Sequence, residues 1–248
     1  MNEYLFNLAG VENFHKETNS RLRFWFKHIR KNALKKDGNI FEFGVYQGAS
    51  LIAAALILKE LGSKKKIYGF DTFSGFPGYS KYDDLNNFKK YENIFFSSSF
   101  LKKFEKFKKD KKFFSKKKKL NIKSIASSGN FKDSSLSLVK EKIKFFKLDN
   151  IKLIKGPFSK TLKKFFKTYN GKISSANMDC DLYKGYEICL PLVYKNLSKK
   201  GFINLDEYYS FKYPGAKIAC DKFFKLKNIK PKKNKVRPGE FERWYVTK

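Results

Sequence analysis

A strand, a glycine turn and a helix follow one another near the start of the chain, and this succession constrains the fold more than any other feature. The apolar residues of Asn39–Phe43 predict a buried strand, and Ala49–Leu61 predicts a helix that Gly62 terminates. Gly44 and Gly48 lie in the turn between them. Such a junction leaves backbone N–H groups and the positive end of a helix dipole facing any ligand beyond the strand. Glycine pairs also occur in ordinary tight turns.

An acid follows the next predicted strand. Lys66–Phe70 is expected to form this strand, and Asp71 comes directly after it. A glycine turn with an acid at the next strand tip is the nucleoside-binding arrangement of doubly wound α/β folds. We therefore expect Asp71 to accept hydrogen bonds from two ribose hydroxyls of a nucleoside-type cofactor. The alternative is that Asp71 caps the turn that follows it.

Strands and helices alternate through the second half of the chain. This order predicts an α/β fold with a mostly parallel, doubly wound sheet of seven strands and helices on both faces. The last two strands are expected to form an antiparallel hairpin. The later strands are predicted at Ile151–Lys155, Ile173–Met178, Gly201–Leu205, Ile229–Lys235 and Phe241–Thr247, and the later helices at Ser134–Phe146, Ser159–Tyr169, Tyr183–Leu197 and Pro214–Leu226.

The length of 248 residues suits one large α/β domain. We expect an N-terminal helical cap at 1–38, a core at 39–71 and 124–248, and a Lys/Phe-rich insertion or lid at 72–123. Within the insertion, Leu101–Leu120 carries eleven lysines with phenylalanines at roughly helical spacing. The pattern favours a solvated amphipathic helix over a mobile lid.

The net charge of +32 invites a nucleic-acid interpretation. Only five of the 55 basic residues are arginine, however, and arginine is the side chain that reads bases and phosphates through two parallel hydrogen bonds. The lysine surplus is more typical of compositional drift than of a functional polyanion surface. We therefore expect no specific nucleic-acid partner.

The chain shows no feature of a membrane or secreted protein. No run of about 18 uncharged apolar residues is present, so no membrane span is predicted. The N-terminus does not resemble a signal peptide. Cys180, Cys189 and Cys220 follow no CxxC pattern and are expected to be reduced core residues. These features predict a cytoplasmic protein.

Acidic residues occur at four predicted strand ends: Glu42, Asp71, Asp179-Cys180-Asp181 and Asp206-Glu207. Carboxylates that converge on one sheet edge repel one another unless a cation lies among them. A metal ion and a positively charged cofactor both fit this requirement. No His or Cys is placed to join Asp179, Asp206 and Glu207, so Mg²⁺ or a similar hard ion is favoured over Zn²⁺. Glu42 is expected to accept a hydrogen bond from a cofactor amine, with a structural role as the alternative.

Five segments resemble motifs of known enzymes. Glu42–Ser50 is similar to the S-adenosylmethionine motif of class I methyltransferases and close to that of catechol O-methyltransferase. The other four resemble motifs of the macrocin O-methyltransferase (TylF-like) family: Tyr68–Pro77, Asp179–Tyr183, Gly201–Tyr208 and the helix that begins at Pro214-Gly215. They follow the family's order over most of residues 38–226. The Lys-rich stretch at 89–120 has no counterpart among these motifs.

The resemblance implies a role for each matched residue. Asp179 and Asp181 would be catalytic, with Asp181 as the general base, and Asp179, Asp206 and Glu207 would hold Mg²⁺. Glu207 stands where the family has a second aspartate, which lengthens its reach by one methylene. Cys180 replaces a glycine, which reduces backbone freedom. The residues expected to contact S-adenosylmethionine are Glu42, Gly44, Tyr46, Gly48, Ser50 and Asp71.

The function implied by this resemblance is an S-adenosylmethionine-dependent, Mg²⁺-assisted O-methyltransferase. Its acceptor would be a hydroxyl of a small molecule, typically a sugar or natural-product glycoside, and a homodimer is a family expectation. Two alternatives remain open at this stage. One is an RNA-directed methyltransferase that uses the basic surface, and the other is a non-catalytic binding protein of the same fold.

Overall fold

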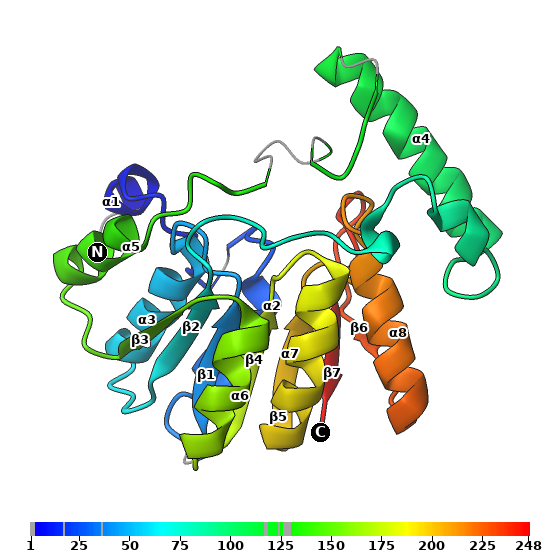
Figure 1. Ribbon diagram of the computed structural model, residues 1–248. Coiled ribbons are helices and arrows are strands. Elements are labelled where there is room, and N and C mark those ends of the chain that lie inside the picture. Colours follow the sequence, from blue (N-terminus) through cyan, green and yellow to red (C-terminus); the bar gives the residue numbers. More distant parts are fainter. Residues whose placement is uncertain (1–2, 17, 36, 117–118, 124, 126–129) are drawn as a thin grey trace.

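A computed structural model describes residues 3–16, 18–35, 37–116, 119–123, 125 and 130–248 (Figure 1). Parts of the predicted cap (1–2, 17 and 36), of the predicted insertion (117–118) and of the predicted core (124 and 126–129) therefore lie outside the described residues. Within the described residues, no helix is both long and apolar enough to cross a membrane.

The centre of the molecule is a seven-stranded sheet in the order β3-β2-β1-β4-β5-β7-β6. The first five strands in this order run parallel, and β7 and β6 add an antiparallel hairpin at one edge. The predicted fold class is confirmed. The strands are β1 (Asn39–Phe43), β2 (Ile67–Asp71), β3 (Ile151–Lys155), β4 (Ile173–Met178), β5 (Leu197–Leu205), β6 (Lys232–Lys233) and β7 (Trp244–Thr247).

Helices cover both faces of the sheet (Figure 1). One hydrophobic cluster joins the face that carries Ile40 to α1, α2, α3 and α5, and a second joins the face that carries Phe41 and Phe43 to α6, α7 and α8. This alternation along β1 follows from the two-residue period of a strand. The helices are α1 (Glu3–Leu8), α2 (Arg23–Asn32), α3 (Ala49–Glu60), α4 (Ser98–Ser115), α5 (Leu136–Phe145), α6 (Phe158–Thr168), α7 (Tyr183–Asn196) and α8 (Gly215–Lys227), with single turns η1 (Lys81–Asp83) and η2 (Phe88–Tyr91).

Several element boundaries differ from the sequence expectation. Strand β2 extends to Asp71 because that residue still pairs with Lys155 of β3. Strand β5 begins at Leu197, four residues before the predicted start at Gly201, because Leu197 pairs with Ile173 of β4. Pro214 is the N-cap of α8 rather than its first helical residue.

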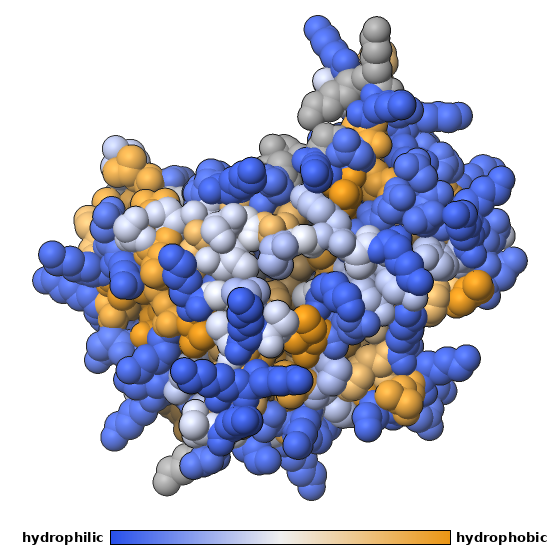
Figure 2. All heavy atoms as spheres, viewed as in Figure 1, coloured by the Kyte–Doolittle hydropathy of each residue, from blue (hydrophilic) through white to orange (hydrophobic). Residues whose placement is uncertain are grey.

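The Lys-rich stretch forms helix α4, which extends away from the sheet (Figure 1). Its first half is anchored by the buried side chains of Phe100 and Phe104, whereas Phe113 and Phe114 near its end are exposed. The amphipathic helix predicted here is confirmed, although it begins three residues before Leu101. Figure 2 shows that hydrophilic side chains cover most of α4 on the face in view.

Candidate active site

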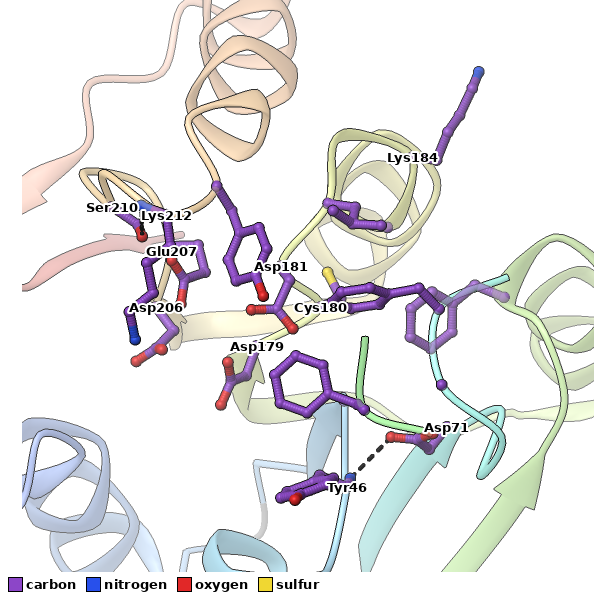
Figure 3. Close-up of a pocket in the computed structure, with 18 of the residues that line it drawn as sticks. Tyr46, Asp71, Asp179, Cys180, Asp181, Lys184, Asp206, Glu207, Ser210 and Lys212 are labelled. Carbon is purple, nitrogen blue, oxygen red and sulfur yellow. Dashed lines mark hydrogen bonds between the residues drawn. The ribbon is translucent and has the colours of Figure 1, made fainter. Parts of the chain in front are cut away.

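A cavity of about 860 Å³ opens at the carboxyl ends of the parallel strands (Figure 3). This volume lies within the range of about 300–1,000 Å³ that is usual for small-molecule pockets. The cavity wall is rich in aromatic side chains from the 72–80 and 206–213 segments. The predicted site residues that line it are Gly44, Tyr46, Ser50, Asp71, Asp179, Asp181, Asp206 and Glu207.

Gly44 joins the ends of two strands. Its φ is +93°, and a Cβ at this position would lie 1.9 Å from the carbonyl oxygen of Asp179. Only glycine therefore allows the turn after β1 to pass this close to the end of β4. Gly44 is expected from the sequence to contact S-adenosylmethionine, and in the structure its freedom serves an approach between two backbone segments. Gly48 is the left-handed N-cap of α3 and faces Val139, outside the residues that line the cavity.

Asp71 holds the glycine turn in shape. Its Oδ2 accepts the amides of Val45 at 2.7 Å and Tyr46 at 2.9 Å, and its Oδ1 accepts the amide of Phe73 at 2.7 Å (Figure 3). The bond from Phe73 corresponds to the turn-capping alternative. The two bonds from the glycine turn were not foreseen, because they join residues about 25 positions apart.

Tyr46 has a φ of +52°, a conformation that costs a non-glycine residue of order 1 kcal/mol or more unless its surroundings fix it. Both ends of the residue are held. Its hydroxyl donates to Asp133 at 2.5 Å, which raises the pKa of Tyr46 to about 12, and its carbonyl accepts the hydroxyl of Ser134. Phe131 packs edge-on against its ring. The role of the 131–134 segment in holding Tyr46 was not predicted, because Asp133-Ser134 resembles an ordinary helix start.

Glu42 corrects one sequence-based expectation. Its side chain is fully buried, lies outside the residues that line the cavity and accepts the side-chain amide of Asn177 at 2.9 Å. Asn177 in turn accepts from Asn204 at 2.8 Å, so a buried polar row crosses β1, β4 and β5. Burial raises the pKa of Glu42 to about 8. The structure thus favours the structural alternative over direct contact with a cofactor amine.

Three carboxylates gather beside the turn that follows β4. Asp179, Asp181 and Glu207 each offer an oxygen, and these oxygens lie within 4.8 Å of one another (Figure 3). Asp181 is held at a φ of +54°. Burial, followed by the charge of neighbouring carboxylates, raises the pKa of Glu207 to about 8 and that of Asp181 well above its ordinary value. Such mutual repulsion is what a bound cation relieves.

Arg21, from the segment before α2, also reaches this cluster. Its Nη2 donates to Asp179 Oδ2 at 2.8 Å, and its Nη1 pairs with Asp206 Oδ2. The grouping therefore differs from the predicted metal set, since Asp181 lies with Asp179 and Glu207 while Asp206 faces Arg21. Sequence reasoning missed Arg21 as a site residue, although its rarity in a lysine-rich chain was a signal.

Asp179, Asp181, Asp206 and Glu207 are here called the acid cluster. This cluster suits a hard divalent cation. Among the described residues, Asp206 Oδ1 and Glu207 Oε2 are buried without a hydrogen-bond partner. Carboxylate oxygens are the ligands that Mg²⁺ and Ca²⁺ take, whereas Zn²⁺ sites usually include nitrogen or sulfur. The carboxylate oxygens of the acid cluster therefore fit Mg²⁺. Cys180, beside the cluster, is a free and buried thiol like Cys189 and Cys220.

Comparison with known proteins gives one family match. Residues 102–237, more than half of the chain, match the model of a family described as macrocin O-methyltransferase (TylF). The matched range includes most of α4, which the sequence motifs had left without a counterpart. No curated protein matches the chain by sequence.

Solved structures share the fold at low sequence identity. The O-methyltransferase NovP superimposes with a TM-score of 0.61 at 17% identity, over 89% of this chain and 75% of that one. The calicheamicin methyltransferase CalS11 gives 0.61 at 19% identity, over 92% and 80%. The methyltransferase PaMTH1 of Podospora anserina, solved with S-adenosylhomocysteine, gives 0.52 at 14% identity, over 99% and 88%.

Proposed function

Since the chain belongs to the macrocin O-methyltransferase family and is thus an S-adenosylmethionine-dependent O-methyltransferase, we propose that it methylates a sugar hydroxyl of a small molecule with the help of Mg²⁺. One observation carries this proposal. The glycine turn and the acid cluster line the same cavity and meet where Gly44 touches the backbone of Asp179. The sugar class is supported by CalS11, which is described in a second structure as a TDP-rhamnose 3'-O-methyltransferase.

S-adenosylmethionine supplies a methyl group that its sulfonium already activates. Helix α3 begins in the cavity, and Ser50 in its first turn would bind the cofactor carboxylate together with the helix dipole. A carboxylate has about four acceptor sites, and three amides use three of them, so Asp71 would accept from one ribose hydroxyl while it keeps these amides. Tyr46, fixed by Asp71 and Asp133, would border the cofactor.

Asp179, Asp206 and Glu207 would hold Mg²⁺, as the resemblance implies, and Mg²⁺ would lower the pKa of an acceptor hydroxyl. Asp181, within 4.8 Å of two of these residues, would then accept the hydroxyl proton. The bound cofactor would supply its methyl group to the acceptor oxygen, with the methyl carbon–sulfur bond broken in exchange for the new carbon–oxygen bond. The products are a methyl ether and S-adenosylhomocysteine. Aromatic residues such as Phe76 line the cavity and would pack against the acceptor's ring.

The test uses labelled S-adenosylmethionine with Mg²⁺ or EDTA and a panel of nucleotide sugars, glycosides, catechols and RNA. We expect label in a sugar-bearing acceptor, with transfer lost in EDTA. Label that appeared only in RNA would support the RNA-directed alternative. Binding of S-adenosylmethionine without transfer to any acceptor would support a non-catalytic protein.

A further inference from the structure

One cationic side chain already occupies the acid cluster. Arg21 bridges Asp179 and Asp206, two of the three residues proposed to hold Mg²⁺. In Figure 3 the carboxylates of these two residues lie beside each other, below those of Asp181 and Glu207. A guanidinium suits this place because its planar fork donates to two carboxylates at once, which a lysine ammonium cannot match.

We propose that Arg21 is a resident counter-ion of the acid cluster that competes with the divalent cation for Asp179 and Asp206. This inference rests on the cation of the proposed function but not on the identity of the acceptor. The oxygens of Asp179 and Asp206 that pair with Arg21 cannot at the same time coordinate the ion. Two cations at one site also repel each other. By thermodynamic linkage, each weakens the binding of the other by the same factor.

The surroundings of Arg21 allow its side chain to move while its backbone stays in place. Leu22 and Trp25 are fully buried, and Arg23 pairs with Glu240 in the segment that precedes β7. The side chain of Arg21 is 38% exposed, so it has a path towards solvent. Competition at the cluster therefore does not require the cap to detach.

Release of Arg21 would also reconcile the observed cluster with the predicted ligand set. Asp206 is only 7% exposed, and its Oδ1 has no partner among the described residues. Once Arg21 leaves, Asp206 becomes available beside Asp179 and Glu207. Asp181 is then left to accept a proton.

Binding of Mn²⁺ alone, measured from the electron paramagnetic resonance signal of the free ion, tests the competition without cofactor or acceptor. We expect Arg21→Gln to bind Mn²⁺ about tenfold or more tightly than the unchanged protein, with Arg21→Lys between the two. Arg23→Gln is the matched control, since it removes an ion pair from the same segment and should change the affinity less than twofold. Circular dichroism checks that each variant is folded. If Arg21→Gln does not fold, the Mn²⁺ affinity of Arg21→Lys is compared with that of the unchanged protein instead.

The reciprocal effect is visible by nuclear magnetic resonance, because the chain has only five arginines and selective ¹⁵N-arginine labelling gives few Nε–H signals. Arg21→Lys assigns the Arg21 signal. Addition of Mg²⁺ should shift that signal and leave that of Arg23 in place.

Unchanged or weaker Mn²⁺ affinity in Arg21→Gln would overturn the inference, as would an Arg21 signal that Mg²⁺ does not move. Failure of both the unchanged protein and the variant to bind Mn²⁺ would overturn it as well. Tighter binding without methyl transfer to any acceptor would instead support the competition and count against the proposed function.

Discussion

Replacement of Glu42 by glutamine tests whether this buried acid is protonated in the folded protein. Glutamine has the shape of a protonated glutamate and keeps an oxygen for the amide of Asn177. It cannot ionise. The variant therefore removes the pH dependence that Glu42 contributes to the free energy of unfolding and leaves the other groups unchanged.

The magnitude follows from the pKa of Glu42, which burial raises from 4.5 to about 8. Between these two pH values the folded state holds a proton that the unfolded state has lost, so stability falls as pH rises through the window. One pKa unit corresponds to about 1.4 kcal/mol, and the three units between pH 5 and pH 8 amount to about 4 kcal/mol. The contribution is fully present below pH 4.5 and is lost at about pH 8.

The assay is urea unfolding followed by circular dichroism at pH 5 and pH 8, in EDTA. We expect Glu42→Gln to have nearly the stability of the unchanged protein at pH 5 and to be about 4 kcal/mol more stable than it at pH 8. Glu105→Gln, at an exposed position on α4, is the control and should leave the pH slope unchanged. Parallel stability curves for Glu42→Gln and the unchanged protein would refute the argument.

Three further outcomes are expected. Asp179→Ala should lower methyl transfer more than about a hundredfold while calorimetry shows S-adenosylmethionine affinity largely retained, and loss of both would indicate a structural role. Gly44→Ala should destabilise the fold by more than about 3 kcal/mol in thermal unfolding, because the new Cβ would meet the backbone of Asp179. Gly62→Ala is the control and should cost about 1 kcal/mol, because Gly62 has a φ of +62° but open space around it. Asp71→Asn should weaken S-adenosylmethionine binding about tenfold by calorimetry, since its amide nitrogen cannot accept a turn amide, and an unchanged affinity would contradict this role.

Much of the sheet was predictable because its signals are local. Strands β1, β3 and β4 begin and end at the predicted residues, each bounded by a polar residue or glycine. The closing hairpin was predicted in kind, but β6 and β7 are shorter than expected. Their ends depend on pairing with β5 and with each other, which periodicity does not report.

The site was predictable only in part, for a related reason. Acids at the carboxyl ends of parallel strands must converge, so the sequence placed Asp179, Asp181 and Glu207 on one sheet edge. It could not show that Arg21, 158 positions before Asp179, reaches the same edge. Nor could it show that Glu42 is fully buried and bonded to Asn177 outside the cavity lining, since this depends on how the elements pack.

The contact between Gly44 and the backbone of Asp179 has a consequence for how this enzyme can diversify. The donor half and the acceptor half of the site are joined through main chain, so the spacing between them does not depend on the choice of side chains around the rim. On the proposed function, substitutions among the residues of the 72–80 segment that line the cavity would alter which molecule is accepted and leave this contact in place. A change of acceptor would then leave the chemistry untouched, because a single residue without a side chain sets the spacing of the two halves.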